Sequence, residues 1–271
     1  MQEIKQIGNV DWTYEELRES ILEFLELYKK KPLPDNEGGM KSPHMFATWF
    51  LLKKINPKNV IESGIWKGQG TWLIENILPN ANIFSIDLKL SLRKYISNKV
   101  KYFDKDFFKI DWSIIPDKEN TVIFFDDHQN AVERIRKGMT LGFKQYIFED
   151  NYPKKQGDCY SLKKAFQHAG LDPADTGSKN IRQIIKNFIK PAKSTKVLPN
   201  SEDSDFLKNV LKIYYEFPPV FKKEKTRWLD NWNEEDYPTP EPLFEKPEQD
   251  YLNVFEKDAT SYTWICYAKL K

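Results

Sequence analysis

Residues 59–72 read NVIESGIWKGQGTW, the pattern of a buried strand, a glycine-rich turn and the start of a helix. Glycines in such a turn let a ligand approach the backbone closely, and the helix N-terminus offers unpaired N–H groups to an anionic group. The spacing of Gly64, Gly68 and Gly70 is GxxxGxG, not the GxGxxG of dinucleotide binding, and no GKS or GKT of a P-loop follows. The stretch therefore predicts a cofactor site, and the alternative is a tight turn without a ligand.

Around this turn, short apolar runs alternate with helical patterns from residue 59 to residue 148. This alternation predicts an α/β fold with a mostly parallel sheet and helices on both faces. We expect four parallel strands, and helices within 70–79, 91–99 and 130–142. Carboxylates follow the apolar runs: Glu62, Asp87, Asp104 or Asp106, Asp126 with Asp127, and Glu149 with Asp150. Because ligands bind at the carboxyl ends of such strands, these acids should meet at one rim of the sheet.

Residues 1–56 are expected to form helices that pack on this core. One helical pattern runs from Tyr14 to about Lys30, and a second runs from Ser42, a candidate N-cap followed by Pro43, to about Ile55. The core is expected to comprise residues 57–171 and 259–271, with a last strand in SYTWICYAKLK, residues 261–271. Residues 172–258, which include a helical pattern at 204–217, then form an insertion or lid before that strand.

Composition excludes several classes of protein. With 271 residues, 40% of them hydrophobic, the chain can bury a full core. The 42 Lys and Arg residues are interspersed with 40 Asp and Glu, so no nucleic-acid partner is indicated. The only cysteines, Cys159 and Cys266, favour a reducing, cytoplasmic compartment. No signal-peptide pattern and no run of roughly 18 apolar residues is present, so we expect no membrane span. The sequence is also compatible with a homo-oligomer.

The run TVIFFDDHQNAVERI, residues 121–135, sets two aspartates and a histidine at the end of a buried strand. Adjacent carboxylates removed from water cost several kcal/mol unless they are paired, hydrated or bound to a cation. Glu149 and Asp150 follow the next strand, and Mg²⁺ or another hard dication prefers such oxygen ligands. We favour Asp127 as a ligand because strand alternation and the neighbouring His128 place it on the rim, while Asp126 faces the cofactor. The residues alone leave this choice open.

These motifs resemble those of class I S-adenosylmethionine-dependent methyltransferases. In that family an acid ends the first strand before a glycine turn, which Glu62, Gly64, Gly68 and Gly70 match. The resemblance implies a Rossmann-like fold and S-adenosylmethionine as cofactor. It also implies that Asp87 binds the ribose hydroxyls. Further cofactor contacts implied in the same way are Ser63, Trp66, Thr71, Asp106, Phe107 and Asp126.

The second acid pair is similar to that of the macrocin O-methyltransferase and cephalosporin hydroxylase-like group. There the acids hold Mg²⁺, which holds the substrate oxygen beside the methyl donor. The resemblance implies that Asp127, Glu149 and Asp150 are the metal ligands. His128 and Asp127 are then the catalytic candidates, with His128 as general base. The chain departs from the group in FFDDHQ, where relatives commonly have glycine or serine between the acid and the histidine.

The expected activity is metal-assisted methylation of a hydroxyl on a small-molecule or saccharide acceptor. Aromatic residues of 226–237 could contact that acceptor, although a packed cover is the simpler interpretation. His44 and His168 are interpreted as structural. One alternative is a metal-dependent nucleotide-sugar glycosyltransferase, because DKD at 104–106 spells a DxD motif. A second alternative is a non-catalytic binding protein with the same fold.

Overall fold

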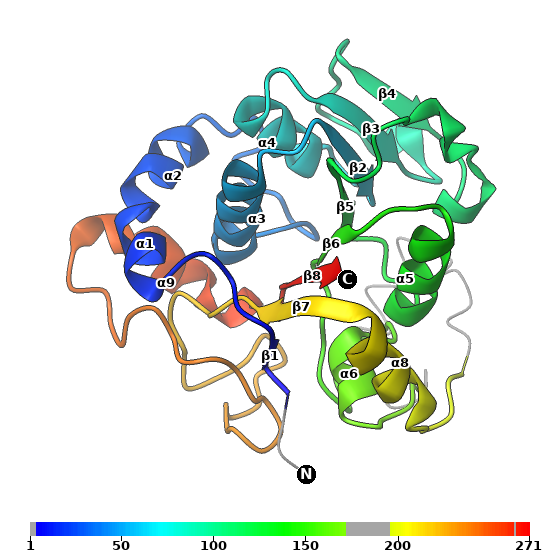
Figure 1. The fold of residues 1–271 in the computed structure, drawn as a ribbon. Helices are drawn as coiled ribbons and strands as arrows, with labels where there is room; N and C mark the ends of the chain where they lie inside the picture. Colours follow the sequence, from blue (N-terminus) through cyan, green and yellow to red (C-terminus); the bar gives the residue numbers. More distant parts are fainter. Residues whose placement is uncertain (1–3, 172–195, 263) are drawn as a thin grey trace.

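The computed structural model describes residues 4–171, 196–262 and 264–271. Within them one sheet has the strand order β1-β7-β8-β6-β5-β2-β3-β4 (Figure 1). The strands are β1 (Gln6–Ile7), β2 (Asn59–Ser63), β3 (Asn82–Ile86), β4 (Val100–Phe103), β5 (Thr121–Phe125), β6 (Gln145–Phe148), β7 (Leu211–Glu216) and β8 (Cys266–Leu270). Strands β2, β3, β4, β5 and β6 pair with one another in parallel. Strand β8 is antiparallel to both β6 and β7, and β1 is antiparallel to β7.

Helices cover both faces of the sheet, because its central strands are buried on both sides. Val60 and Val122 pack into one core cluster, and Ile61 and Ile123 pack into a second. The first cluster is shared with α1 (Tyr14–Glu19), α2 (Ile21–Tyr28), α3 (Ser42–Ile55), α4 (Gln69–Ile77) and α9 (Asn253–Asp258). The second is shared with α5 (Ala131–Thr140), α6 (Leu162–Phe166) and α8 (Glu202–Val210), as Figure 1 shows. The predicted α/β fold with a mostly parallel, Rossmann-like sheet is confirmed.

The strand order reverses between β2 and β5. From β2 the chain continues to β3 and β4 on one side, while β5 and β6 lie on the other. Ligands of open α/β sheets bind at the carboxyl ends of the strands at such a reversal. The glycine turn after β2 and the acids after β5 therefore lie at the place where a ligand is expected.

Two predicted elements differ in the structure. The sheet has five parallel strands, β2 to β6, rather than the four expected. The helix expected at 91–99 is wrong: only a 3₁₀ helix forms at Leu90–Leu92. The reason is tertiary, since the N–H groups of Lys94 and Tyr95 both bond to the carbonyl of Lys67 and hold this segment against the glycine turn.

The segment 204–217 is helical only in its first half. Helix α8 ends at Val210, and Leu211–Glu216 becomes β7, which pairs with β8 and β1. Part of the expected insertion therefore belongs to the main sheet, and a lid role for the rest of 172–258 stays a prediction. The calls on residues 172–195 lie outside the described residues.

The two helices predicted before residue 56 form with changed bounds. The pattern 14–30 is divided at Ser20 into α1 and α2. Ser42 is the first residue of α3 rather than its N-cap, which is Lys41. The N–H and Oγ of Ser42 instead donate to Asp258 Oδ2 at 3.2 and 2.9 Å. Among the described residues, no helix has both the length and the apolar composition of a membrane span.

Candidate active site

The glycine turn brings the ends of β2 and β5 into backbone contact. Gly64 has φ 101°, and a Cβ there would lie 1.9 Å from the carbonyl oxygen of Asp126. Gly68 has φ 92°, and its Cβ would lie 2.6 Å from the carbonyl oxygen of Tyr95. Side chains are strained at such φ values and cannot fit so close to backbone. These two glycines are required by the turn itself.

Asp87, after β3, bonds to the glycine turn. Its Oδ2 accepts from the N–H groups of Ile65 and Trp66 at 3.1 and 3.0 Å, and its Oδ1 accepts from Lys89 N–H at 2.8 Å. Trp66 has φ 50°, and its indole N–H donates to the carbonyl of Glu37 at 3.0 Å. The carboxylate thus fixes the turn, and it remains half-exposed at the rim.

Glu62 is fully buried at the end of β2. Its Oε2 accepts from the hydroxyls of Thr71 and Ser85, both at 2.6 Å. Its Oε1 has no hydrogen-bond partner among the described residues and lies beside Gly70, where a Cβ would come within 2.5 Å of it. Burial raises the pKa of Glu62 to about 7, against the lowering effect of the two hydroxyls. An unpaired buried oxygen fits a donor group on a ligand.

Three potential metal ligands meet at the ends of β5 and β6. One ligand atom each from Asp126, His128 and Asp150 lies within 4.8 Å of the others. Asp158 is the fourth member of this rim cluster, since His128 Nδ1 lies 3.0 Å from Asp158 Oδ1 and 3.2 Å from Asp150 Oδ2. His128 has φ 53°, a left-handed backbone conformation that is uncommon for residues other than glycine. We use "rim cluster" below for Asp126, His128, Asp150 and Asp158.

Charges within the rim cluster shift its pKa values strongly. Burial, and then the charges of Glu149 and Asp150, raise the pKa of Asp126 well above its ordinary value. The carboxylates of Asp150 and Asp158 raise the pKa of His128 well above its ordinary value. Without a cation the imidazole therefore carries a proton that offsets part of the negative charge.

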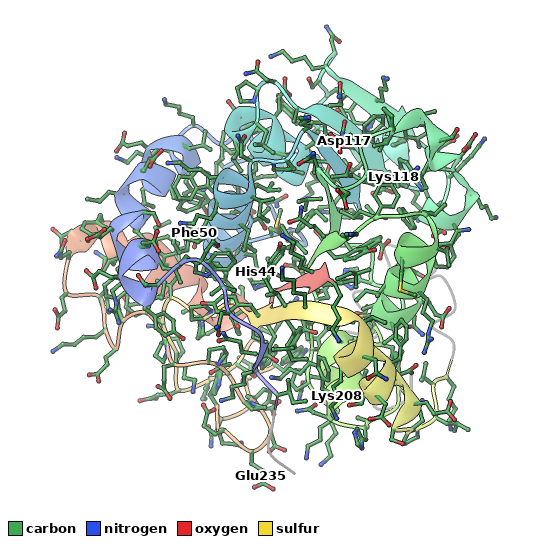
Figure 2. All side chains as sticks on the ribbon, viewed as in Figure 1. His44, Phe50, Asp117, Lys118, Lys208 and Glu235 are labelled. Carbon is green, nitrogen blue, oxygen red and sulfur yellow. The ribbon has the colours of Figure 1, made fainter. Side chains whose placement is uncertain are left out.

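Glu149 pairs with His44, which lies on α3 in the interior and is labelled in Figure 2. Burial alone would raise the pKa of Glu149, but the charge and hydrogen bond of His44 outweigh it and lower the pKa to about 2. Glu149, predicted as a metal ligand, is thus held by a histidine interpreted from the sequence as structural. The rim cluster that the structure brings together includes Asp150 but not Glu149.

Asp127 also lies apart from the position expected for a metal ligand. Its Oδ2 accepts from Ser63 Oγ at 2.6 Å and from Arg134 Nη2 at 2.8 Å. The guanidinium of Arg134 also donates two hydrogen bonds to Asp106, at 3.1 and 2.8 Å. Asp126 therefore lies in the rim cluster and Asp127 pairs with a buried arginine, and the roles expected for the two aspartates stay predictions.

The predicted adenine contacts are occupied by protein. Phe107 is fully buried and packs against Trp112 and Phe125, with ring centroids at 5.4 and 5.3 Å. Burial would raise the pKa of Asp106, but the hydrogen bonds and charge of Arg134 lower it. Phe107 is thus enclosed by protein, whereas Asp106 pairs with Arg134 and keeps 32% of its side chain exposed.

Sequence reasoning missed three partners of the site: Arg134, Asp158 and His44. Arg134 had a detectable signal, since it lies with Ala131, Ile135 and Gly138 on the buried stripe of α5. A charged residue on a buried stripe is almost always paired, so a partner acid could have been sought. Asp158 lies in an irregular loop, for which no periodicity exists.

No protein-family model matches the chain, and no curated protein matches it. Among solved structures, the apo-structure of CmcI-N160 has 15% identity, covers 52% of this chain and 66% of its own, and has a TM-score of 0.35. A caffeoyl-CoA O-methyltransferase from Staphylococcus aureus, described as putative, has 16% identity, coverage of 73% and 82%, and a TM-score of 0.38. An S-adenosylmethionine dependent methyltransferase from Listeria monocytogenes, also described as putative, has 24% identity, coverage of 41% and 55%, and a TM-score of 0.30.

Proposed function

We propose that the chain is an S-adenosylmethionine-dependent O-methyltransferase in which a divalent cation, such as Mg²⁺, holds the acceptor hydroxyl beside the methyl donor. The observation that carries this proposal is the contact between Gly64 and Asp126. This contact places a glycine turn of the type that binds a cofactor next to the rim cluster, whose side chains are suited to bind a divalent cation. Methyl donor and acceptor would then meet across one strand boundary, which is the proximity that the reaction requires.

The residues around the turn fit the proposed cofactor in chemical type. Asp87 has carboxylate oxygens at the rim, and a carboxylate can accept hydrogen bonds from both hydroxyls of a ribose. Glu62 Oε1, buried and without a hydrogen bond in the described part of the chain, suits an ammonium group. The hydroxyl of Thr71 donates to Glu62, and that of Ser63 donates to Asp127, so both side chains hold acids of the site in place.

The rim cluster fits a hard dication in its two carboxylates, Asp126 and Asp150, since both lie at the ends of neighbouring strands and the buried Asp150 Oδ2 contacts His128 Nδ1 at 3.2 Å as an ion pair without hydrogen-bond geometry. When bound, the cation would supply the positive charge that lowers the pKa of the acceptor hydroxyl. Asp158 bonds to Nδ1 of His128 and thereby orients the ring. The other nitrogen, Nε2, is then the atom of His128 that can accept a proton from the hydroxyl.

The glycosyltransferase alternative is less well supported by the geometry. A DxD motif needs both aspartates near one cation, but Asp106 is bound by Arg134 in a bidentate pair, whereas Asp104 is exposed. A guanidinium in that position repels a cation. The alternative of a non-catalytic binding protein predicts cofactor binding without transfer.

Binding and transfer measurements separate these functions. Isothermal titration should show binding of S-adenosylhomocysteine, and a screen of hydroxylated acceptors with radiolabelled S-adenosylmethionine should show Mg²⁺-dependent methyl transfer. Asp150→Asn should abolish transfer while leaving S-adenosylhomocysteine binding within about twofold. The matched control is Asp104→Asn, an exposed acid after β4 that should change neither. Binding of a nucleotide sugar with Mn²⁺ and not of S-adenosylhomocysteine would refute the proposal.

A further inference from the structure

The positively charged side chain of Arg227, on the segment that follows β7, lies close to the rim cluster. Arg227 is exposed, and its Nη1 donates to the phenol oxygen of Tyr152 at 3.3 Å. Its guanidinium also lies 5.6 Å from the ring centroid of Trp228. Tyr152 follows Asp150 by two residues, so this contact ties Arg227 to the loop that carries a proposed metal ligand.

The electrostatic field at Arg227 comes from the same acids. The pKa of Arg227 is raised, first by Tyr152 and then by the charges of Asp150, Glu149 and Asp158, which outweigh the opposite effect of the partial burial of its guanidinium beside Tyr152. Yet within residues 4–171, 196–262 and 264–271 the guanidinium has one hydrogen bond and no ion pair. A guanidinium carries five N–H donors, so most of them are available to a ligand.

The side chains beneath Arg227 are closely packed. The ring of Tyr152 lies so close to Gly157 that a Cβ there would come within 1.9 Å of Tyr152 Cδ2. Its backbone carbonyl accepts the hydroxyl of Ser161. Trp228 packs on Tyr152 with ring centroids at 5.9 Å and stacks on Trp264 at 6.4 Å. A well-supported side chain loses less entropy on binding and gives geometric selectivity.

We propose that Arg227 binds a carboxylate of the methyl acceptor while the acceptor's hydroxyl lies at the rim cluster. This inference rests on the proposed function and narrows it to acidic hydroxylated acceptors. A planar, bidentate guanidinium matches a carboxylate well. The half-buried face of Trp228 next to it suits an aromatic ring between the two groups.

Two probes with the same vicinal hydroxyls test the inference: 3,4-dihydroxybenzoate, which has a carboxylate, and catechol, which lacks it. Their binding is measured by titration calorimetry in the presence of Mg²⁺ and S-adenosylhomocysteine. The wild-type protein should bind dihydroxybenzoate about tenfold more tightly than catechol, since a charged hydrogen-bonded pair contributes at that level. Arg227→Met should remove this preference and change catechol binding by less than about twofold.

A matched control is Lys225→Met, which removes an exposed cation two residues away and should retain the preference. Titration with Mg²⁺ alone adds a readout that a merely structural role would not give. Arg227→Met should bind Mg²⁺ as tightly as the wild type or up to about threefold more tightly, because one repelling charge is gone. If Arg227→Met instead disrupts the structure, the variant should bind Mg²⁺ and both probes more weakly than the wild type, and that result overturns the inference.

The two levels of the proposal fail in different ways. Suppose that the wild type binds S-adenosylhomocysteine and Mg²⁺ but binds the two probes equally well, or binds neither probe. The inference about Arg227 is then refuted, and the proposed function is not. Retention of the preference in Arg227→Met refutes it equally. If the wild type binds neither S-adenosylhomocysteine nor Mg²⁺, the proposed function is refuted and the inference with it.

Discussion

Arg134 connects two acids that follow different strands. Its guanidinium, on a side chain only 3% exposed, pairs with Asp106 after β4 and Asp127 after β5. Removing one partner of a buried ion pair leaves uncompensated charge, so Arg134→Met should lower the free energy of unfolding by roughly 3 kcal/mol. Urea denaturation followed by circular dichroism measures this loss.

Arg136, two residues after Arg134 on α5, is a matched control for that experiment. It pairs with Asp203 at 3.0 Å, but its side chain is 38% exposed. Solvent screens such a pair, and Arg136→Met should therefore cost no more than about 1 kcal/mol. Equal losses in the two variants would mean that Arg134 contributes little beyond a surface ion pair.

Glu62 gives the stability of the protein a dependence on pH of definite sign. Its pKa in the folded protein is about 7, above the ordinary value of 4.5, mainly because of burial. Between these values the folded state binds a proton that the unfolded state has released. The free energy of unfolding should therefore fall as pH rises through this window, by up to about 3 kcal/mol.

The comparison with Glu62→Gln isolates this contribution. Glutamine does not ionise, so the stability difference between wild type and variant should shift in favour of the variant as pH rises from about 4.5 to 7. Urea denaturation at a series of pH values measures it. A difference that stays constant across the series would show that Glu62 keeps an ordinary pKa.

At the residue scale, the sequence placed the acids at one rim but could not choose among them. Strand alternation says that Asp126 and Asp127 point different ways, but the strand ends between them and alternation stops there. The choice depends on Arg134, which is close in space through α5. The same holds for Glu149, whose partner His44 lies 105 residues away in the chain. Such pairings depend on how helices pack on the sheet.

At the scale of elements, the turn between β2 and α4 tolerates no side chain at its first glycine. In Gly64→Ala the new Cβ would meet the backbone of Asp126 at 1.9 Å, in addition to the strain at φ 101°. Because backbone cannot move aside cheaply, we expect a loss of roughly 3 kcal/mol or more in stability. We also expect S-adenosylhomocysteine binding to be lost, as measured by calorimetry.

Gly142 separates the two causes of that loss. It also has a left-handed conformation, at φ 89°, but the nearest atom to its Cβ is a flexible lysine carbon at 3.5 Å. Gly142→Ala should cost only about 1 to 2 kcal/mol, the backbone strain alone, and should leave ligand binding unchanged. If both variants lose the same free energy of unfolding, the close approach of β2 to β5 is not the reason that Gly64 is required.

Elements were predicted well where their periodicity was strong and their partners were adjacent in the chain. The turn, α4 and α5 are of this kind. The errors at 91–99 and 211–216 have a common cause, because both segments bond to distant backbone: Lys67 for the first, and β1 and β8 for the second. Tertiary hydrogen bonds of this kind override the propensity of a short segment.

At the scale of the whole molecule, the strand order places the site. Residues 62, 87, 126 and 150 come from four strand ends, and the order β6-β5-β2-β3 brings these ends together without any local signal linking them. The α/β alternation predicted that these acids share one rim of the sheet, but not the order of the strands. The participation of β7 in the sheet was not predicted either, since it depends on a strand pairing made by the end of the chain.

The rim cluster should make the whole protein less stable until a cation is bound. Burial and the neighbouring acids Glu149 and Asp150 disfavour the charge on Asp126. Asp126→Asn removes that charge, so without metal the variant should unfold at a higher temperature than the wild type at pH 8. For the wild type, Mg²⁺ at about 100 times its dissociation constant should add about 2.7 kcal/mol, whereas the variant should gain far less. Thermal unfolding of the wild type and of Asp126→Asn, each with EDTA and with Mg²⁺, measures these stabilities. Asp104→Asn is the control and should behave as the wild type. A variant that is less stable in EDTA yet keeps the full response to Mg²⁺ would show that these acids serve another purpose than holding a cation.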